Sequence, residues 1–187
     1  MSQAEPGEPM ARITLQNPET SPEAFAFLTE KRGASAQFNV FRLIANVPDI
    51  MHAFLPMADV VRQGYGIDPQ LRELAVIMTC QTIGSHYERD RHWNMAIGLG
   101  VPKAKLERLW DFDDSDAFSA LEIAVLRLAR DATRAPEQVD AKIWQSVSDA
   151  LGEQQALALL FSIAWYNMTA RITGPLKLRD EPGFARL

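Results

Sequence analysis

Glu88 and His92 are the residues of this sequence whose types and spacing best fit chemistry. They lie four residues apart in the segment Ser85-His86-Tyr87-Glu88-Arg89-Asp90-Arg91-His92, so on a helix their side chains meet on one face. At about 100° per residue, apolar side chains share that stripe: Met95, Ala96 and Leu99. A carboxylate beside an imidazole can deliver or accept a proton near neutral pH. The spacing therefore predicts an inward-facing acid–base pair.

The same pair also fits a structural role, as a buried ion pair that fixes the orientation of the helix. A third carboxylate, Glu73, precedes an uncharged run over residues 74–85, which predicts a buried helix. A glutamate in the first turn of a helix is commonly exposed and stabilised by the helix dipole. The residues alone therefore favour an exposed Glu73, and Arg72 is expected to face solvent or another subunit.

Four further residues are candidates for binding a substrate. Ser85, His86 and Tyr87 lie near the bend expected at Gly84 and could line a pocket. An interface or capping role fits His86 and Tyr87 equally well. Asn167 is the fourth, because with Arg171 it could face a carboxylated ligand, whereas the aromatic pair before it is typical of core or interface packing.

A metal site is a minority alternative, since His86, Glu88 and His92 cluster in the sequence. The His-Glu-x-x-His spacing of zinc proteases and the Glu-x-x-His spacing of di-iron bundles are both absent. The sequence also contains no Gly-x-Gly-x-x-Gly run or phosphate-binding loop. We therefore expect neither a metal nor an organic cofactor.

The bulk properties limit the partners and the cellular location. The 187 residues suffice for one domain with a substantial core. A net charge of −5 without a Lys/Arg cluster argues against nucleic acid and against an anionic membrane surface. No apolar stretch is long enough to span a bilayer, and residues 1–9 do not have the pattern of a signal peptide. Cys80 is the single cysteine, so we expect a cytoplasmic protein without an intramolecular disulfide.

Helix openers, helix breakers and apolar periodicity predict an all-α, single-domain bundle of eight or nine helices. The expected helices cover about residues 22–32, 38–47, 48–63, 69–83, 85–99, 102–109, 117–133, 140–151 and 152–172. The acidic segment 113–116 is expected to link two of them and to cap the helix that follows. Residues 1–20 are expected to be a flexible lead-in, residues 21–174 the helical domain, and residues 175–187 a tail.

Four sequence features together resemble the carboxymuconolactone decarboxylase family. They are Glu73, Ser85-x-x-Glu88-x-x-x-His92, Ala96-x-x-Leu99-Gly100-Val101 and Tyr166-Asn167-Met168-x-Ala170-Arg171. The resemblance covers most of residues 35–172. It implies the helical fold shared with alkylhydroperoxidases, a homo-oligomer (trimer or hexamer), and functional roles for Glu73, Glu88 and His92.

The chain departs from the alkylhydroperoxidase branch at the two positions that carry its chemistry. That branch has Cys-x-x-Cys-x-x-x-His, and here Ser85 and Glu88 stand at the cysteine positions. A disulfide-cycling peroxidase needs a thiolate nucleophile and a resolving thiol, so that activity is not expected. The chain is similar instead to the cysteine-less decarboxylase branch.

The resemblance implies a cofactor-independent lyase that acts on a small carboxylated lactone, or a related acid, from the catabolism of aromatic compounds. His92 is then expected to deliver a proton, Glu88 to orient it, and Glu73 or Tyr87 to assist. The alternative is a non-catalytic oligomeric small-molecule-binding protein of the same fold, in which the Glu88–His92 pair is structural.

Overall fold

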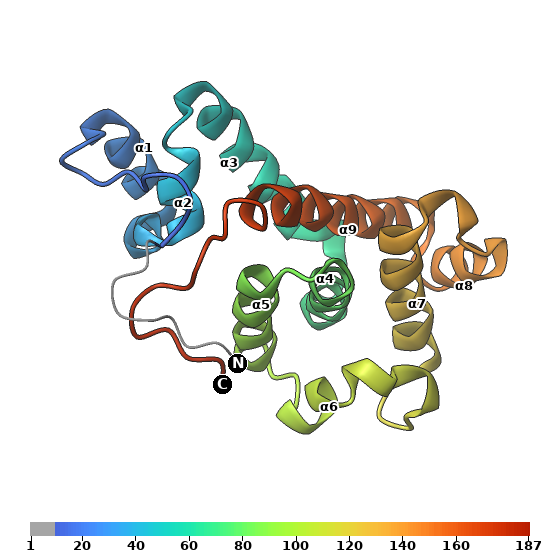
Figure 1. Cartoon of the computed structure of the whole chain (residues 1–187). Helices are drawn as coiled ribbons and strands as arrows, with labels where there is room; N and C mark the ends of the chain where they lie inside the picture. Colours follow the sequence, from blue (N-terminus) through green and yellow to red (C-terminus); the bar gives the residue numbers. More distant parts are fainter. Residues whose placement is uncertain (1–9) are drawn as a thin grey trace. The chain divides into compact units, whose positions relative to one another are not determined.

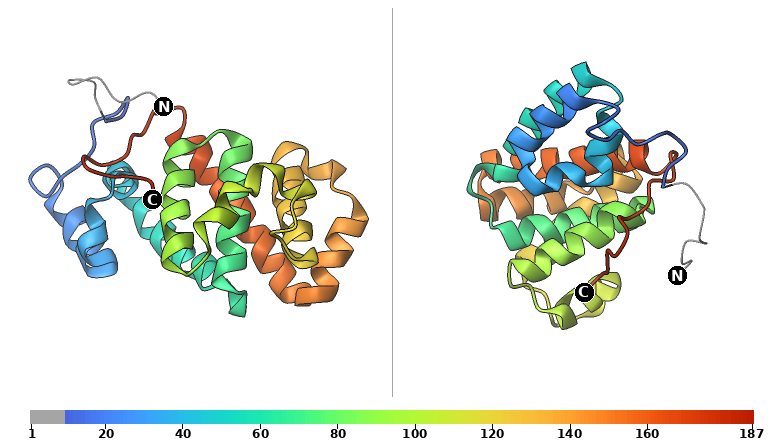
Figure 2. Two further views of the ribbon diagram at one scale, coloured as in Figure 1. Left: turned by 90° about the horizontal axis from the view of Figure 1, so that it is seen from below. Right: turned by 90° about the vertical axis from the view of Figure 1, so that its left-hand side faces the viewer.

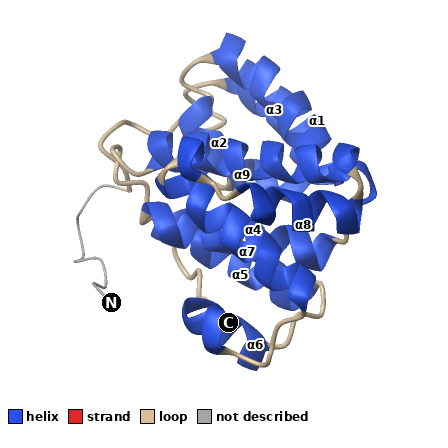
Figure 3. Cartoon of the chain, turned by 90° about the vertical axis from the view of Figure 1, so that its right-hand side faces the viewer, coloured by secondary structure: helices blue, strands red, loops and turns tan. Residues whose placement is uncertain are grey.

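The computed structural model of the protein describes residues 10–187, which form nine α-helices, four 3-10 helices and no strand (Figures 1 and 3). The α-helices are α1 Pro22–Arg32, α2 Asn39–Ile44, α3 Pro48–Gln63, α4 Pro69–Ile83, α5 His86–Gly98, α6 Lys103–Glu107, α7 Ala120–Arg134, α8 Ala141–Leu151 and α9 Glu153–Thr173. The 3-10 helices are η1 Gly33–Gln37, η2 Gly64–Gly66, η3 Leu109–Asp114 and η4 Pro136–Gln138. The predicted all-α class is confirmed. The first nine positions of the segment expected to be flexible lie outside the described residues.

The described residues divide into two compact units. An N-terminal unit comprises residues up to 57 together with 172–184, and a central unit comprises residues 58–171 together with 185–187. The sequence predicts one domain over residues 21–174. This predicted range includes parts of both units. None of the helices in residues 10–187 has the length and apolar character needed to cross a membrane.

The N-terminal unit joins α1, α2 and the first part of α3 to the segment that follows α9. The amide of Arg12 donates to the carbonyl of Leu176 at 2.7 Å, and the amide of Arg179 donates to the carbonyl of Met10 at 2.9 Å. Figure 2 shows the segment after α9 as an extended trace without helix. Large apolar side chains buried in this unit are Phe25, Leu28, Leu43, Met51 and Leu55.

Helix α4 is the most deeply buried element of the central unit. The Asp68 carboxylate caps its start by accepting the amide of Gln70 at 2.9 Å, and Gly84, at φ 79°, ends it with its amide on the carbonyls of the last turn. Residues 71–80 are all buried, because α4 packs against both α5 and α7 (Figure 1). A helix enclosed in this way normally carries apolar residues all round. Charged residues within it must therefore find partners inside the protein.

One hydrophobic core joins α4 to the helices around it. Its fully buried members include Leu74, Ile77, Ala96, Leu106, Leu109, Val125, Leu126, Val147, Leu159 and Ile163. Helix α7 starts with a capping box, in which Ser119 and Glu122 each accept the other's main-chain amide. The predicted cap in segment 113–116 is therefore wrong, because a capping box satisfies two amides reciprocally and fixes the helix start at Ser119.

Helix α5 carries the sequence motif along the side of α4. Its buried residues Glu88, His92 and Ala96 lie on the predicted stripe, and Tyr87 and Trp93, which were not predicted on it, are buried as well. Leu99 was expected on the same stripe, but it is 40% exposed because the helix ends at Gly98. The last residues of the chain hold α5 from another side: the Trp93 indole donates to the main-chain oxygen of Leu187 at 2.8 Å, and Asn94 bonds to the main chain of Ala185 and Leu187.

Candidate active site

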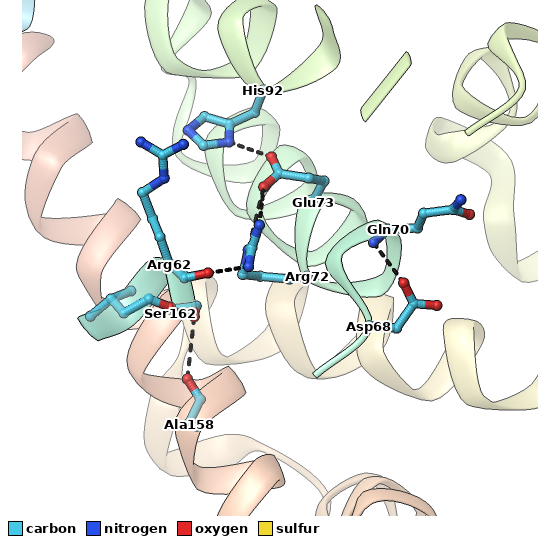
Figure 4. Close-up of polar contacts among 9 residues, drawn as sticks. Arg62, Asp68, Gln70, Arg72, Glu73, His92, Ala158 and Ser162 are labelled. Atoms are coloured by element: carbon cyan, nitrogen blue, oxygen red, sulfur yellow. Dashed lines mark hydrogen bonds and ion pairs between the residues drawn. The ribbon is translucent and has the colours of Figure 1, made fainter. Parts of the chain in front are cut away.

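The central contact of the site joins two helices. Nδ1 of His92 on α5 lies 2.5 Å from Oε2 of Glu73 on α4 (Figure 4). Because an ionised carboxylate can only accept hydrogen bonds, Nδ1 carries the hydrogen. Nε2 is then the ring nitrogen that can exchange a proton with another molecule. Glu73 is 1% exposed, so the expectation of an exposed first-turn carboxylate is wrong: α4 is enclosed on every side.

Arg72 occupies the second oxygen of the same carboxylate. Its Nη2 lies 3.1 Å from Oε1 of Glu73, and its Nη1 donates to the main-chain carbonyl of Arg62 in the last turn of α3. Arg72 is buried within the single chain, so the expectation of a solvent-facing or subunit-facing side chain does not hold. One carboxylate therefore joins a guanidinium to an imidazole.

The charge state of Glu73 follows from this environment. Burial raises the pKa of the Glu73 carboxyl, but His92 and Arg72, by charge and by hydrogen bonds, lower it more, so the pKa lies below its ordinary value. Glu73 is therefore ionised at neutral pH. It provides a fixed negative acceptor that orients the His92 ring.

Glu88 lies in the same buried region, as the sequence predicts. It is 5% exposed. The charges of Glu88 and Glu73 act on the same two neighbours, Cys80 and Tyr166. Burial, followed by the charges of Glu88 and Glu73, raises the pKa of the Cys80 thiol well above its ordinary value. The same causes raise the pKa of Tyr166. Two carboxylates, one imidazole, one thiol and one phenol therefore share one part of the central unit.

Tyr166 is a site residue that the sequence analysis assigned to packing. Its ring on α9 meets the ring of His92 edge-on, with 4.3 Å between the centroids. Because its pKa is raised well above the ordinary value, the phenol stays protonated and can donate a hydrogen bond. The available signal was the segment beginning at Tyr166 that resembles the family's last helix. Neighbouring helical residues point about 100° apart, so Asn167, the residue predicted from the sequence, points in a different direction from Tyr166.

Asn167 is engaged in helix packing. Its amide nitrogen donates to Thr133 Oγ1 on α7 at 2.9 Å, and its amide oxygen accepts a hydrogen bond from Arg171 at 2.7 Å. The predicted Asn167–Arg171 neighbourhood is therefore present. Asn167 and Arg171 are bonded to each other, and Asn167 is also bonded to Thr133 on α7. The structure does not bring either residue into the group around His92.

The three candidates at the start of α5 differ in exposure. Ser85 is buried and precedes the helix without forming a side-chain cap bond. Tyr87 is buried, with the Arg91 guanidinium 4.8 Å from its ring centroid. His86 is exposed. Of the three, Ser85 and Tyr87 share the buried side of α5 with Glu88.

The residues proposed for the minority metal alternative do not converge. His86 is exposed, whereas Glu88 and His92 are buried. Within residues 10–187, no three side chains of His, Cys, Asp or Glu are grouped so that they could hold a metal ion.

Arg62 also belongs to this site, and the sequence offered no signal for it. It lies at the end of α3, where a basic residue is common because it complements the helix dipole. In Figure 4 its side chain points from α3 toward the His92 ring. Its positive charge acts against the rise in the pKa of Tyr166. Only the tertiary fold brings this arginine to the region of α4 and α5.

Comparison with known proteins gives a family match over one segment of the chain and the fold of the whole. Residues 48–131 match the sequence profile of the Carboxymuconolactone decarboxylase family. No curated protein matches the chain in sequence.

Three solved structures illustrate the shared fold. A peroxidase-related protein from Ralstonia eutropha JMP134, with an alkylhydroperoxidase AhpD core, has a TM-score of 0.80 at 17% identity, over 94% of this chain and 95% of that one. Another peroxidase-related protein, from Silicibacter sp. TM1040, has a TM-score of 0.79 at 16% identity, over 96% of both chains. The debrominase Bmp8 has a TM-score of 0.77 at 18% identity, over 91% of this chain and 92% of that one. These likenesses confirm the predicted alkylhydroperoxidase-like fold.

Proposed function

The segment 48–131 belongs to the Carboxymuconolactone decarboxylase family, and on this premise we propose that the protein is a cofactor-independent lyase with His92 as its general acid. The substrate in this proposal is a small carboxylated lactone or a related acid from aromatic catabolism. The observation that carries the proposal is the 2.5 Å contact between Nδ1 of His92 and the buried, ionised Glu73. It fixes which ring nitrogen faces away from the protein carboxylate.

The proposed reaction is the loss of CO₂ from an acid that is conjugated to a carbonyl. The bond between the substrate carbon and its carboxylate breaks, and the electron pair moves into the conjugated carbonyl as CO₂ leaves. Nε2–H of the His92 imidazolium then protonates the carbon, and the neutral imidazole regains a proton from water. Glu73 remains ionised throughout and stabilises the imidazolium form. The chemistry requires neither an oxidant nor a reductant.

Two neighbouring groups have supporting roles in this proposal. Tyr166, protonated and in contact with His92, can donate a hydrogen bond to the carbonyl oxygen that gains negative charge. Glu88 lies in the same buried region and acts by charge on Cys80 and Tyr166. Glu73, not Glu88, is the carboxylate assigned to orient the ring.

A disulfide-cycling peroxidase is a poorer fit to the same residues. Cys80 is the one cysteine of the sequence, its side chain is buried, and its thiol pKa is raised by burial and by two carboxylates. The raised pKa lowers the fraction of nucleophilic thiolate, and a single cysteine leaves no second thiol to resolve an oxidised form. The acid–base proposal uses groups whose charge state suits the task.

The test of the proposal is His92→Gln with a panel of carboxylated lactones and keto acids, monitored by CO₂ release and ultraviolet absorbance. We expect turnover to fall about 10²–10⁴-fold, because general acid catalysis contributes that much. Circular dichroism checks that the helical fold is retained. His52→Gln is the matched control, because it removes a histidine of the N-terminal unit that packs against Phe27. Near-normal turnover of His92→Gln would remove His92 from the mechanism.

A non-catalytic small-molecule-binding protein is the second candidate. The observation that favours it is the complete use of the Glu73 carboxylate, whose two oxygens are already bonded to Arg72 and His92. Buried ion-pair groups of this kind can be replaced by apolar residues without loss of stability. A triple variant Arg72→Met, Glu73→Leu, His92→Leu that is as stable as the wild type and still binds its ligand would support this candidate.

We also propose that the protein is a homo-oligomer, a trimer or a hexamer. Leu157, Phe161 and Met168 form an apolar stripe along α9 and are 50%, 52% and 40% exposed in the single chain. A stripe of large apolar residues is costly in water and suits contact with a second copy. Light scattering after size-exclusion chromatography should give three or six chains for the wild type. Phe161→Glu should yield smaller species.

A further inference from the structure

Residues 185–187 bind the side of α5 that lies opposite His92. At about 100° per residue, Asp90 and Asn94 each point about 160° away from His92. His92 contacts Glu73 of α4, whereas Asp90 and Asn94 contact residues 185–187. Figures 1 and 2 show the end of the chain beside α5. Helix α5 is therefore held from two opposite sides, by α4 and by residues 185–187.

Asn94 binds the main chain of this segment with both ends of its amide. Its Nδ2 donates to the carbonyl oxygen of Ala185 at 2.8 Å, and its Oδ1 accepts the amide of Leu187 at 2.9 Å. Main-chain groups two residues apart on an extended segment face the same side, so one side-chain amide can bond both, as a neighbouring strand does. Asn94 therefore holds residues 185–187 in an extended conformation.

Trp93 and Arg186 add two further contacts. The indole of Trp93 donates to the main-chain oxygen of Leu187 at 2.8 Å. The guanidinium carbon of Arg186 lies 4.8 Å from the centroid of the Trp93 ring, and its Nη1 lies 3.4 Å from Oδ1 of Asp90. A guanidinium over an indole is attracted by the ring quadrupole. Arg186 thus joins two successive turns of α5.

Polar contacts, more than apolar burial, hold this segment. Leu187 is 57% exposed, and Ala185 and Arg186 are exposed as well. The preceding residues 172–184 belong to the N-terminal unit, whereas residues 185–187 belong to the central unit. The contacts with Asp90, Trp93 and Asn94 are therefore what joins the segment to the central unit.

The geometry of the Glu73–His92 contact depends on how α5 is held. Glu73 is fixed within α4, because Arg72 binds its other oxygen and residues 71–80 are all buried. The strength of a hydrogen bond falls steeply with poor distance or angle. Helix α5 begins at His86 without a side-chain cap bond from Ser85. Contacts farther along α5 must then keep the His92 ring in place, and Trp93 and Asn94 directly follow it.

We propose that residues 185–187 position His92: by binding Trp93 and Asn94 they keep α5 where Nδ1 of His92 meets Glu73. Asn94 and Arg186 are thus positioning residues, which act on the site through the helix. The inferred position of the ring depends on no particular activity. Its consequence for turnover rests on the proposed function.

A segment that only fastens the end of the chain makes a different prediction. Loss of its contacts would release residues 185–187, and the Glu73–His92 contact would be unchanged. A measurement on the His92 ring itself separates the two roles.

The experiment is nuclear magnetic resonance of the full chain labelled with ¹⁵N in histidine, with the rate of exchange of the His92 Nδ1–H with water as the readout. The sequence has three histidines, and loss of one signal in His92→Gln assigns the resonance. Asn94→Ala removes both main-chain bonds, and alanine favours the helix. We expect exchange to become about 10- to 100-fold faster, as for a local opening that has lost two hydrogen bonds.

Arg186 gives a second, milder test on an exposed side chain. Arg186→Ala should speed the exchange about 2- to 10-fold, because a cation–π contact and a partly exposed ion pair are lost. Arg186→Lys should recover most of the wild-type rate, since it keeps a cation near Trp93 and Asp90. Gln145→Ala is the matched control for Asn94→Ala: it removes an exposed amide of α8 that bonds to Asp149, and the exchange rate should not change.

Three results would overturn the inference: wild-type exchange in Asn94→Ala, an equal increase in Gln145→Ala, or no recovery in Arg186→Lys. Circular dichroism checks that each variant keeps its helices. On an active panel compound, Asn94→Ala should lower kcat about 10- to 100-fold with little change in KM, as for a misplaced catalytic group. If exchange rises and turnover is normal, the acid role of His92 falls and the positioning stands. If His92→Gln is inactive and exchange in Asn94→Ala is unchanged, the proposed function stands and the positioning falls.

Discussion

Helix α4 supplies Glu73 to the central contact and helix α5 supplies His92. The two helices differ in how far they are buried and in how many charged residues they carry. Helix α4 is apolar except for Arg72, Glu73 and a few uncharged polar residues, and residues 71–80 are all buried. Helix α5 is rich in charge, and its outer positions form pairs such as Arg89–Asp90 at 2.7 Å. A charge on α5 can turn to the surface, whereas a charge on α4 cannot.

This difference between the helices shows how a buried charge can indicate a functional site. On α5, burial of His92 and Glu88 follows from helical spacing, which the sequence displays directly. On α4, Glu73 breaks an enclosed helix, and such a residue is retained only with partners. The contact that orients His92 therefore runs across the helices, from α4 to α5, and not along α5.

The largest expected effect compares the two carboxylates in catalysis. Glu73→Gln keeps the shape and a hydrogen-bond acceptor but removes the charge that stabilises the His92 imidazolium. We expect turnover to fall about 10²–10⁴-fold, as when the orienting carboxylate of a catalytic histidine is lost. Glu88→Gln should cause a smaller loss under the same assay. Equal losses, or a larger loss for Glu88→Gln, would return the orienting role to Glu88.

The next effect concerns stability. Glu73→Leu leaves Arg72 and His92 buried without their shared acceptor, so we expect a loss of about 3–5 kcal/mol in the free energy of unfolding. Urea unfolding monitored by circular dichroism measures it. Asp111→Ala is the comparison, because it removes one partner of the exposed pair with Arg108 and should cost about 1 kcal/mol or less. Similar costs for both variants would contradict the distinction between α4 and the surface.

The pH dependence of the unfolding free energy tests the same difference between the buried Glu73 and the surface. The pKa of Glu73 is lowered from its ordinary value of 4.5, so the unfolded chain binds a proton at Glu73 at a higher pH than the folded chain does. Its contribution to stability is full above the unfolded value and is lost as the pH falls through the lowered one. Unfolding free energies measured at about pH 7, 5 and 4, and below, should decline more steeply for the wild type than for Glu73→Gln. Parallel curves would show that the Glu73 carboxylate has no favourable environment in the folded state.

The smallest effect compares the starts of the two helices. Asp68 accepts the amide of Gln70 and caps α4, so Asp68→Ala should cost about 1 kcal/mol. Ser85 precedes α5 without a side-chain cap bond, so Ser85→Ala should cost less than about 0.5 kcal/mol. Thermal unfolding of both variants checks the difference. A cost for Ser85→Ala as large as that for Asp68→Ala would mean that Ser85 caps α5 in solution.

Local signals explain why so much of the fold could be predicted from the sequence. Prolines at positions 22, 48 and 69 each mark the first residue of an observed helix, since proline is pre-organised for that position. The start of α7 has no such proline, and there the predicted cap was misplaced.

The site could be predicted only in part, because its contacts depend on tertiary structure. The burial of Glu88 and His92 followed from spacing within one helix. The contact of Glu73 with His92 joins residues 19 positions apart, and the roles of Tyr166 and Arg62 depend on how α9 and α3 approach α4 and α5. Such contacts have no periodic signal in the sequence.

Cys80 has a practical consequence for measurements on the molecule. Its side chain is fully enclosed in α4 and its thiol resists ionisation, so the native protein should react slowly with maleimide reagents. A cysteine introduced on an exposed helix of either compact unit would then be the preferred labelling position. Pairs of spin labels or fluorophores placed in this way could report the distance between the two units, and its distribution, in a protein that needs no cysteine-free background.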